Sequence, residues 1–228
     1  MSSRVIGARP GYDRGARFVN RAARTALITL LLAAVPVARP AVAATRILAF
    51  GDSLTAGLGL APDQAFPAQL AARLRADGYD VVVVNGGVSG DTTSDGLARL
   101  DWSMADHPDI VLLELGANDM LRGLDPRRAA ANLDAIVAKL KAAKVKILLL
   151  GMRASSNWGV DYQKSFDAIY PALAKNYQVP LVPFFLEGVA LDPKLNQPDM
   201  LHPNPAGVAV IVGRVAPAVE RLLGKPEG

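Results

Sequence analysis

Short apolar runs alternate with longer amphipathic segments along most of the chain. Five of these runs, each four to six residues long, are rich in valine, isoleucine and leucine, and four of them are followed by a glycine within two residues. Apolar runs of this length between turn residues are typical of buried strands. The five predicted strands are Arg46–Phe50, Val81–Val84, Ile110–Leu115, Lys146–Leu150 and Val179–Phe184.

Between these runs, apolar residues recur about one helical turn apart, as Phe66, Leu70 and Leu74 do. The predicted helices are Phe66–Ala76, Pro126–Ala143, Tyr162–Tyr177 and Asn204–Leu223. Pro171 should kink or split the third of them, because proline has no N–H and its ring crowds the preceding turn. Strands that alternate with helices predict βαβ units, and therefore an α/β fold with a parallel sheet covered on both faces.

Composition narrows the fold and the chemistry. The 228 residues suffice for one domain or two small ones, and no Gly/Ser-rich linker or repeat divides them, so we expect one domain over residues 44–228. The chain has no cysteine, which excludes a catalytic thiol, a thiolate metal site and any disulfide.

Residues 1–43 have the composition of a secretory signal peptide. They hold seven arginines and one acid, followed by the apolar run Thr25–Ala38 and the small-residue pattern Ala41-Val42-Ala43. The apolar run would be about 21 Å long as a helix, whereas a bilayer core is roughly 30 Å thick. We therefore expect a cleaved Sec-type leader and a bacterial periplasmic or secreted protein; an uncleaved anchor is the alternative. Because the positive charge of the chain sits in this leader, nucleic-acid binding is not expected.

In a parallel sheet the loops at the carboxyl ends of the strands bind ligands, and three such loops combine glycine with short polar residues: Gly51-Asp52-Ser53-Leu54, residues 86–91 and Gly116-Ala117-Asn118-Asp119.

Only two histidines are present. His107 precedes the third predicted strand, on the wrong edge of the sheet, and a surface-loop role is expected for it. His202 follows Asp199 by three residues, close enough for the carboxylate to reach the imidazole. A serine just after a strand, as Ser53 is, is more often a helix cap than a nucleophile, and the G-x-S-x-G elbow of α/β-hydrolases is absent.

Four blocks of sequence together resemble those of the SGNH/GDSL hydrolases, in the same order along the chain from about residue 46 to residue 222. The blocks are Gly51-Asp52-Ser53-Leu54, Gly90, Gly116-x-Asn118-Asp119 and Asp199-x-x-His202-Pro203. Finer matches, among them Ser89-Gly90-Asp91-Thr92-Thr93 with Arg99 six residues later, are similar to the bacterial thioesterase I, lysophospholipase and arylesterase subgroup. Met200-Leu201 departs from the small, glycine-led pair usual there.

The resemblance implies a flavodoxin-like, three-layer α/β/α fold with a five-stranded parallel sheet in the order 2-1-3-4-5. It further implies that Ser53 is the nucleophile, that His202 is the base and that Asp199 orients the histidine. The N–H groups of Ser53 and Gly90, with the side-chain amide of Asn118, would form the oxyanion hole. No metal or organic cofactor is implied.

The function expected from these residues is hydrolysis of small-molecule acyl esters or thioesters through an acyl-enzyme on Ser53. Two alternatives remain open: a carbohydrate O-acetyl esterase on the same fold, and a non-catalytic exported binding module. The loops after the third and fourth strands should line the substrate groove; their apolar residues are Met120, Leu121, Leu124 and Trp158. The sequence gives no oligomeric state.

Glu114 lies near the end of a predicted buried strand, where an ionised carboxylate needs a partner. Arg153, just past the next strand, is the expected partner in a structural ion pair, with a substrate-facing glutamate as the alternative.

Overall fold

The computed structural model describes residues 44–226, which form a five-stranded sheet with every strand parallel. The strands are β1 (Thr45–Gly51), β2 (Val81–Gly87), β3 (Ile110–Leu113), β4 (Lys146–Leu150) and β5 (Leu181–Val182). Their order in the sheet is β2-β1-β3-β4-β5, as predicted. The signal peptide expected over residues 1–43 lies outside the described residues.

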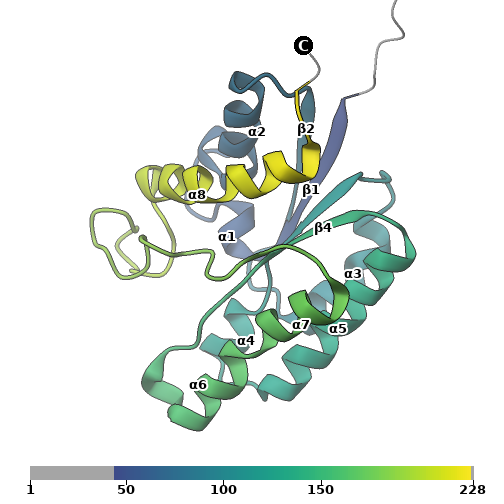
Figure 1. The fold of residues 1–228 in the computed structure, drawn as a ribbon. Coiled ribbons are helices and arrows are strands. Elements are labelled where there is room, and N and C mark those ends of the chain that lie inside the picture. The colour runs from purple at the N-terminus through teal and green to yellow at the C-terminus, as the bar shows by residue number, and fades with distance from the viewer. Residues whose placement is uncertain (1–43, 227–228) are drawn as a thin grey trace, which may run out of the picture. The chain divides into compact units, whose positions relative to one another are not determined.

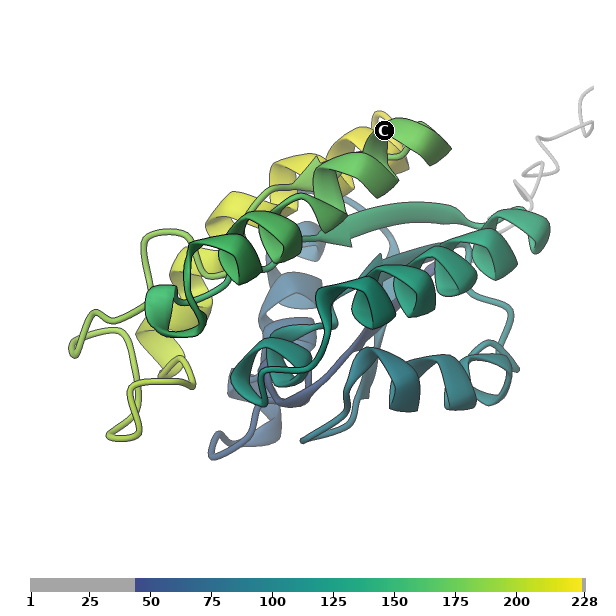
Figure 2. The same cartoon turned by 90° about the horizontal axis from the view of Figure 1, so that it is seen from below.

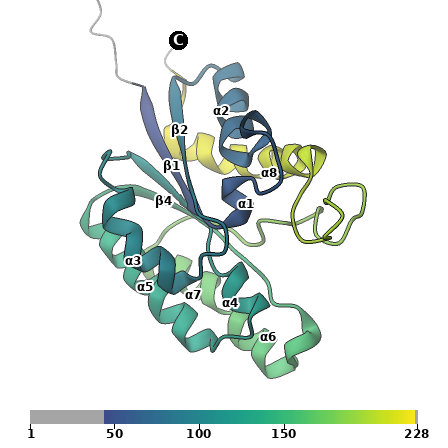
Figure 3. The ribbon, with the colours of Figure 1, turned by 180° about the vertical axis from the view of Figure 1, so that it is seen from behind.

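Helices cover both faces of this sheet (Figure 1). On one side lie α1 (Ser53–Ala56), α2 (Phe66–Ala76) and α8 (Pro205–Leu223), and on the other lie α3 (Thr93–Ser103), α4 (Ala117–Leu121), α5 (Pro126–Ala142), α6 (Val160–Asp167) and α7 (Ile169–Tyr177). Two short 3₁₀ turns, Pro62–Gln64 and Ser156–Trp158, lie in the loops. In Figure 2, seen from below, the green and teal helices α7 and α5 lie in front of the strands. Figure 3 shows α2 and α8 on one side of the strands and α3, α5 and α7 on the other. The three-layer α/β/α prediction is confirmed.

The middle strands supply the centre of the core. Every residue of β3 and every residue of β4 after Lys146 is buried, which matches their nearly uninterrupted apolar sequences. Helix α2 buries Phe66, Leu70 and Leu74, the residues that its spacing placed on one face. The buried layers fix the strands firmly, so the loops at their carboxyl ends start from rigid positions.

The long helix predicted over Tyr162–Tyr177 is two helices, α6 and α7, which meet at Ala168. Pro171 explains the break, because it cannot donate a hydrogen bond to the carbonyl four residues earlier, that of Asp167. The fifth strand is shorter than predicted: prolines at 180 and 183 have no N–H for the ladder, so only Leu181 and Val182 pair with β4.

Helix α3 was not predicted, because its apolar stripe is too sparse to show a helical period. Its start is fixed by a capping box, in which Thr92 and Asp95 exchange hydrogen bonds. Within residues 44–226, no helix has the length and apolar character needed to cross a membrane.

Candidate active site

Ser53 is the first residue of α1, immediately beyond the end of β1. Asp52 caps this helix, since its Oδ1 accepts a hydrogen bond from the N–H of Leu54 at 3.0 Å. The turn before it is so tight that a Cβ on Gly51 would collide with the side chains of Thr55 and Glu114. The sharp turn from strand to helix lets the Ser53 hydroxyl reach the edge of the sheet, although the residue is only 9% exposed.

His202 lies beside Ser53 although 149 residues separate them. The Nε2 atom of His202 is 2.9 Å from the Ser53 Oγ, and its Nδ1 atom is 2.6 Å from the Oδ2 of Asp199. A serine hydroxyl, an imidazole and a carboxylate are thus joined in series. This is the arrangement in which a base can take the serine proton while an acid fixes the tautomer of the base.

The segment from Asp199 to His202 is a local turn closed by the aspartate. Its Oδ1 accepts hydrogen bonds from the backbone N–H groups of Leu201 and His202, at 2.9 and 3.0 Å. Hydrogen bonds from the His202 backbone, from the His202 ring and then from the Leu201 backbone lower the pKa of Asp199 to about 2. Met200 adopts the left-handed backbone conformation, with φ of 61°, which glycine adopts more easily. The departure from a glycine-led pair at this position therefore leaves the turn formed but strained.

The backbone N–H groups of Ser53 and Gly90 donate to no acceptor within residues 44–226. Gly90 follows β2 and has φ of 91°, a conformation that L-residues rarely adopt. Arg122 holds the loop from the other side, because its Nη2 donates to the Gly90 carbonyl at 2.8 Å. Backbone N–H groups without an acceptor, one of them on Ser53 itself, are donors of the kind that stabilise a developing oxyanion.

Asn118, in α4 after β3, points its amide nitrogen at two acceptors. The Nδ2 atom donates to the Asp52 Oδ2 at 3.1 Å and to the Asp91 carbonyl at 3.0 Å. The side chain therefore lies at the junction of the loops after β1, β2 and β3, where the sequence placed it. Both of its N–H groups are already engaged, so donation to a substrate oxygen would require one of these bonds to be shared or exchanged.

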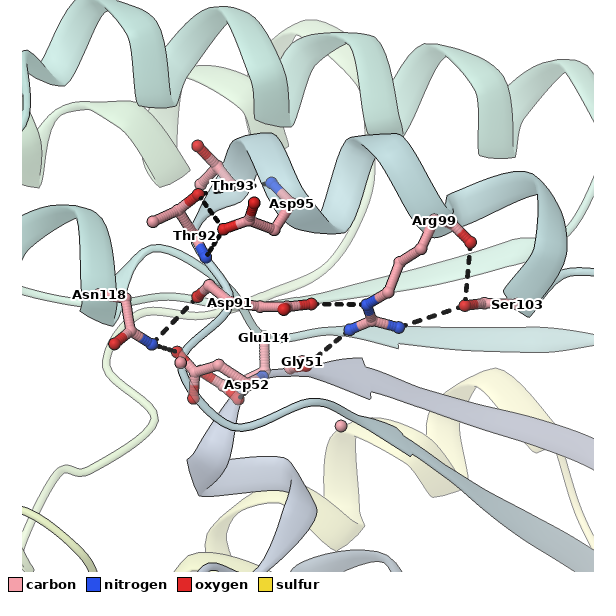
Figure 4. Close-up of polar contacts among 12 residues, drawn as sticks. Gly51, Asp52, Asp91, Thr92, Thr93, Asp95, Arg99, Ser103, Glu114 and Asn118 are labelled. Carbon is pink, nitrogen blue, oxygen red and sulfur yellow. Dashed lines mark hydrogen bonds and ion pairs between the residues drawn. The ribbon is translucent and has the colours of Figure 1, made fainter.

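Arg99 ties two of these loops together and was missed as a site residue by sequence reasoning (Figure 4). From α3, its guanidinium contacts the Asp91 carboxylate, the Gly51 carbonyl at 2.9 Å and the Ser103 hydroxyl at 3.2 Å. The same group lies 4.2 Å from the centre of the Phe50 ring. The sequence did place Arg99 in a motif shared with the subgroup, but the motif does not show which groups its guanidinium contacts.

The ion pair expected between Glu114 and Arg153 is wrong. Arg153 lies 3.6 Å from Glu187 instead, with both side chains largely exposed. Glu114 is fully buried under α1, and its Oε2 accepts hydrogen bonds from the Thr55 hydroxyl at 2.8 Å and from the Asp52 N–H at 3.2 Å. The arginine extends outward, where water solvates it, rather than into the sheet.

Apolar residues expected to line a substrate groove lie in the loops beyond β3 and β4. Leu121, Leu124 and Trp158 are 46%, 38% and 48% exposed, whereas Met120 is partly buried against the core. The Trp158 ring lies over Gly123, where a Cβ would approach it to 2.7 Å, so the two loops touch. Half of the indole remains open to solvent, and a ligand could cover it.

Within the described part of the chain, no three histidine, aspartate or glutamate side chains gather as a metal site would require. The groups that this site brings together are the Ser53 hydroxyl, the His202 imidazole and the surrounding N–H donors.

Comparison with known proteins gives the family. Residues 49–210 match the model of the GDSL-like Lipase/Acylhydrolase family. The chain is 41% identical over 201 residues to Esterase TesA of Pseudomonas aeruginosa, covering 88% of this chain and all of that protein. It is 44% identical over 165 residues to Thioesterase 1/protease 1/lysophospholipase L1 of Escherichia coli strain K12, covering 72% of this chain and 78% of that protein.

A solved structure gives the same result. The SGNH-hydrolase family esterase AlinE4 superposes with a TM-score of 0.67 at 47% identity, covering 80% of this chain and 98% of that one.

Proposed function

The chain belongs to the GDSL-like lipase/acylhydrolase family and is a serine hydrolase of esters and thioesters, and on that premise we propose that Ser53, His202 and Asp199 are its catalytic triad. One observation carries the assignment: the His202 ring lies between the Ser53 hydroxyl and the Asp199 carboxylate, at hydrogen-bond distance from both. His107 has no part in it, since it lies in the loop that enters β3, at the opposite edge of the sheet.

In the first half of the reaction, Ser53 Oγ attacks the acyl carbonyl while His202 Nε2 takes the hydroxyl proton. Asp199 stays ionised and holds the Nδ1 proton, so that Nε2 is the free base. The C–O or C–S bond to the leaving group then breaks, and the leaving alkoxide or thiolate takes the proton from His202. Water repeats the sequence on the acyl-serine, releasing the carboxylic acid and restoring the Ser53 hydroxyl.

The oxyanion that forms in each half would accept from the N–H groups of Ser53 and Gly90. Asn118 would supply a third donor by exchanging its bond to the Asp91 carbonyl for one to the oxyanion. The bond from the same amide to Asp52 would persist and keep the nitrogen turned toward the reacting centre. Such donors contribute most when they are held in place before charge develops.

For the substrate, we propose aryl esters and short- to medium-chain acyl esters or thioesters. Half-exposed Leu121 and Trp158 beside the site favour an apolar acyl or aryl group. The names of the relatives, which include an esterase and a thioesterase/lysophospholipase, favour the same class over a carbohydrate O-acetyl esterase. A non-catalytic binding module has no need of the serine–histidine–aspartate series.

Labelling with a fluorophosphonate tests the nucleophile directly. The wild-type protein should be labelled on the peptide that contains Ser53 and should lose p-nitrophenyl esterase activity in step. Ser53→Ala should take no label and should lower kcat by about 10⁴–10⁶-fold, as removal of a triad nucleophile does. Ser165→Ala, which removes an exposed hydroxyl in α6, is the matched control. Normal turnover by Ser53→Ala would refute the assignment.

We also propose that the protein is exported and that residues 1–43 are removed. The support is the leader's composition alone: an arginine-rich stretch, a short apolar run and a small-residue cleavage pattern. Mass spectrometry of the native protein should find the N-terminus at Ala44 or Thr45. A membrane-bound form that retains Thr25–Ala38 would instead support the anchor.

A further inference from the structure

Glu114 presents a buried polar atom that the catalytic cycle does not use. The residue follows β3, and its side chain is 0% exposed. The Oε2 atom accepts two hydrogen bonds, from the Thr55 hydroxyl and from the backbone N–H of Asp52. The Oε1 atom has no hydrogen-bond partner in the part of the chain that the structure describes. An ionised carboxylate in this position would leave part of its charge buried without a partner, which is strongly unfavourable.

The groups that face Glu114 cannot neutralise a negative charge. Asp52 from the end of β1 is an acid, Thr55 from α1 is neutral, and Tyr170 from α7 donates its hydroxyl to the Leu115 carbonyl. Among residues 44–226, no lysine or arginine forms an ion pair with Glu114. His202 acts on this cluster only through its charge interaction with Asp52.

A proton on Glu114 removes this conflict. Burial, and then the charge of Asp52, raise the pKa of Glu114 well above its ordinary value. Burial also raises the pKa of Asp52, to about 6, against the lowering effect of its hydrogen bonds. The two acids are adjacent, because the Asp52 N–H donates to Glu114 Oε2 at 3.2 Å, and a side-chain hydrogen bond between them contributes to both pKa shifts. Two carboxyl groups can share such a contact only when one of them carries a hydrogen.

We propose that Glu114 is a neutral carboxylic acid in the working enzyme, and that its hydroxyl donates a hydrogen bond to the carboxylate of Asp52. The Oε2 atom still accepts from the Thr55 hydroxyl and from the Asp52 N–H. One negative charge then remains on the pair and resides on Asp52. Glu114 touches neither the substrate nor the reacting atoms, so it is a positioning residue.

The protonation state of Glu114 affects the proposed oxyanion hole through Asp52. The Asp52 carboxylate accepts from Leu54 N–H at one oxygen and from Asn118 Nδ2 at the other. An ionised carboxylate can only accept, so Asn118 must present its nitrogen rather than its oxygen to it. Glu114 fixes that carboxylate, and the series Glu114–Asp52–Asn118 determines which end of the amide faces the substrate; Figure 4 shows the bond between Asn118 and Asp52.

The protonation state can be measured without any enzymatic assay, by urea unfolding of Glu114→Gln and wild type between about pH 7 and 8.5. Unfolded Glu114 ionises near pH 4.3, whereas the folded residue keeps its proton. The wild-type folding equilibrium constant should therefore fall, relative to that of Glu114→Gln, by about tenfold per pH unit until folded Glu114 ionises. Glutamine has no proton to lose, and Asp52 is ionised in both proteins in this range.

The control for this titration is Glu187→Gln, which neutralises an exposed glutamate beside Arg153. Its stability relative to wild type should not change with pH in this range. A pH-independent difference between Glu114→Gln and wild type would overturn the proposal, because it would mean that folded Glu114 is ionised at pH 7.

The positioning role rests on the proposed function and needs kinetics as well. Glutamine can donate to Asp52 and accept from Thr55, so Glu114→Gln should keep kcat within about threefold of wild type, as an isosteric neutral donor should. Glu114→Leu loses both bonds and should lower kcat by about 10–100-fold with little change in KM, by analogy with the loss of oxyanion-hole geometry. Equal loss in the two variants would overturn the role. The unfolding result stands even if Ser53 is not the nucleophile, so the two failures are distinguishable.

Discussion

The Asp199 carboxylate contacts both the backbone and the ring of His202: its Oδ1 accepts a hydrogen bond from the His202 N–H at 3.0 Å, and its Oδ2 lies 2.6 Å from the ring Nδ1. Ring and backbone are thereby fixed by a single carboxylate. The orientation of the His202 ring therefore depends on four consecutive residues, 199–202, whereas its position beside Ser53 depends on the whole fold.

The first prediction concerns pH. The pKa of Asp199 is lowered to about 2, so its share of stability is present above about pH 3.9, the unfolded value, and is lost only as pH falls through about 2. An activity loss on mild acidification therefore does not come from Asp199, whereas protonation of the catalytic base, or of Asp52 with its pKa raised to about 6, should lower kcat/KM as pH falls. His107→Ala should leave the profile unchanged. An acid limb that disappears in His107→Ala would reverse the assignment of the base.

The second prediction concerns Asn118. Asn118→Ala should lower kcat by about 10²–10³-fold with a small change in KM, as loss of one oxyanion donor does. The measurement is steady-state hydrolysis of p-nitrophenyl acetate. A large rise in KM with kcat preserved would mark Asn118 as a group that binds the ground state, and its bonds to Asp52 and Asp91 would then be purely structural.

Arg99 gives the third prediction. Its guanidinium bonds the Asp91 carboxylate and the Gly51 carbonyl at once, with both charged side chains less than one-fifth exposed. Lysine cannot span both groups, so Arg99→Lys should destabilise the fold by about 1.5–3 kcal/mol, the typical loss of a charged hydrogen bond. It should also lower kcat, because the loops that carry Ser53 and Gly90 lose their common brace.

The matched comparison for Arg99 is Lys139→Ala, which breaks the solvent-exposed pair with Asp101. Exposed pairs contribute about 0–1 kcal/mol, so urea midpoints and kcat should hardly move. Similar effects in the two variants would show that the Arg99 contacts do not support the site.

The fourth prediction concerns substrate length. Trp158 packs over Gly123 with about half of its surface exposed (48%), so an acyl or aryl group can bury the rest. Each methylene buried there contributes up to about 0.8 kcal/mol, or roughly fourfold in binding. Trp158→Ala should reduce kcat/KM for octanoyl or phenyl esters far more than for acetyl esters. An equal loss at every chain length would mean that the ring only joins the two loops.

The linear sequence determined the architecture and the local half of the site. Uninterrupted apolar runs predicted the buried strands, and the amphipathic period predicted α2, α5 and α8, because burial selects side chains at the period of the element that carries them. The three-residue spacing of Asp199 and His202 likewise suffices for one turn to join them. The start of α3 is indicated by its capping residues, Thr92 and Asp95, and not by a helical period of apolar residues, so the apolar pattern did not predict this helix.

The tertiary structure alone decided which distant groups meet. His202 reaches Ser53 across 149 residues, and Arg99 reaches the carbonyl of Gly51, at the end of β1, across 48 residues. Glu114 is the clearest example. Its place in a buried strand predicted that its carboxylate has a partner, and the position of Arg153 just past the next strand suggested that residue, but the fold places Asp52 and Thr55 there instead. A pattern along the chain records which side chains must be buried, whereas the identity of a partner depends on how the sheet order and the turns bring strand ends together.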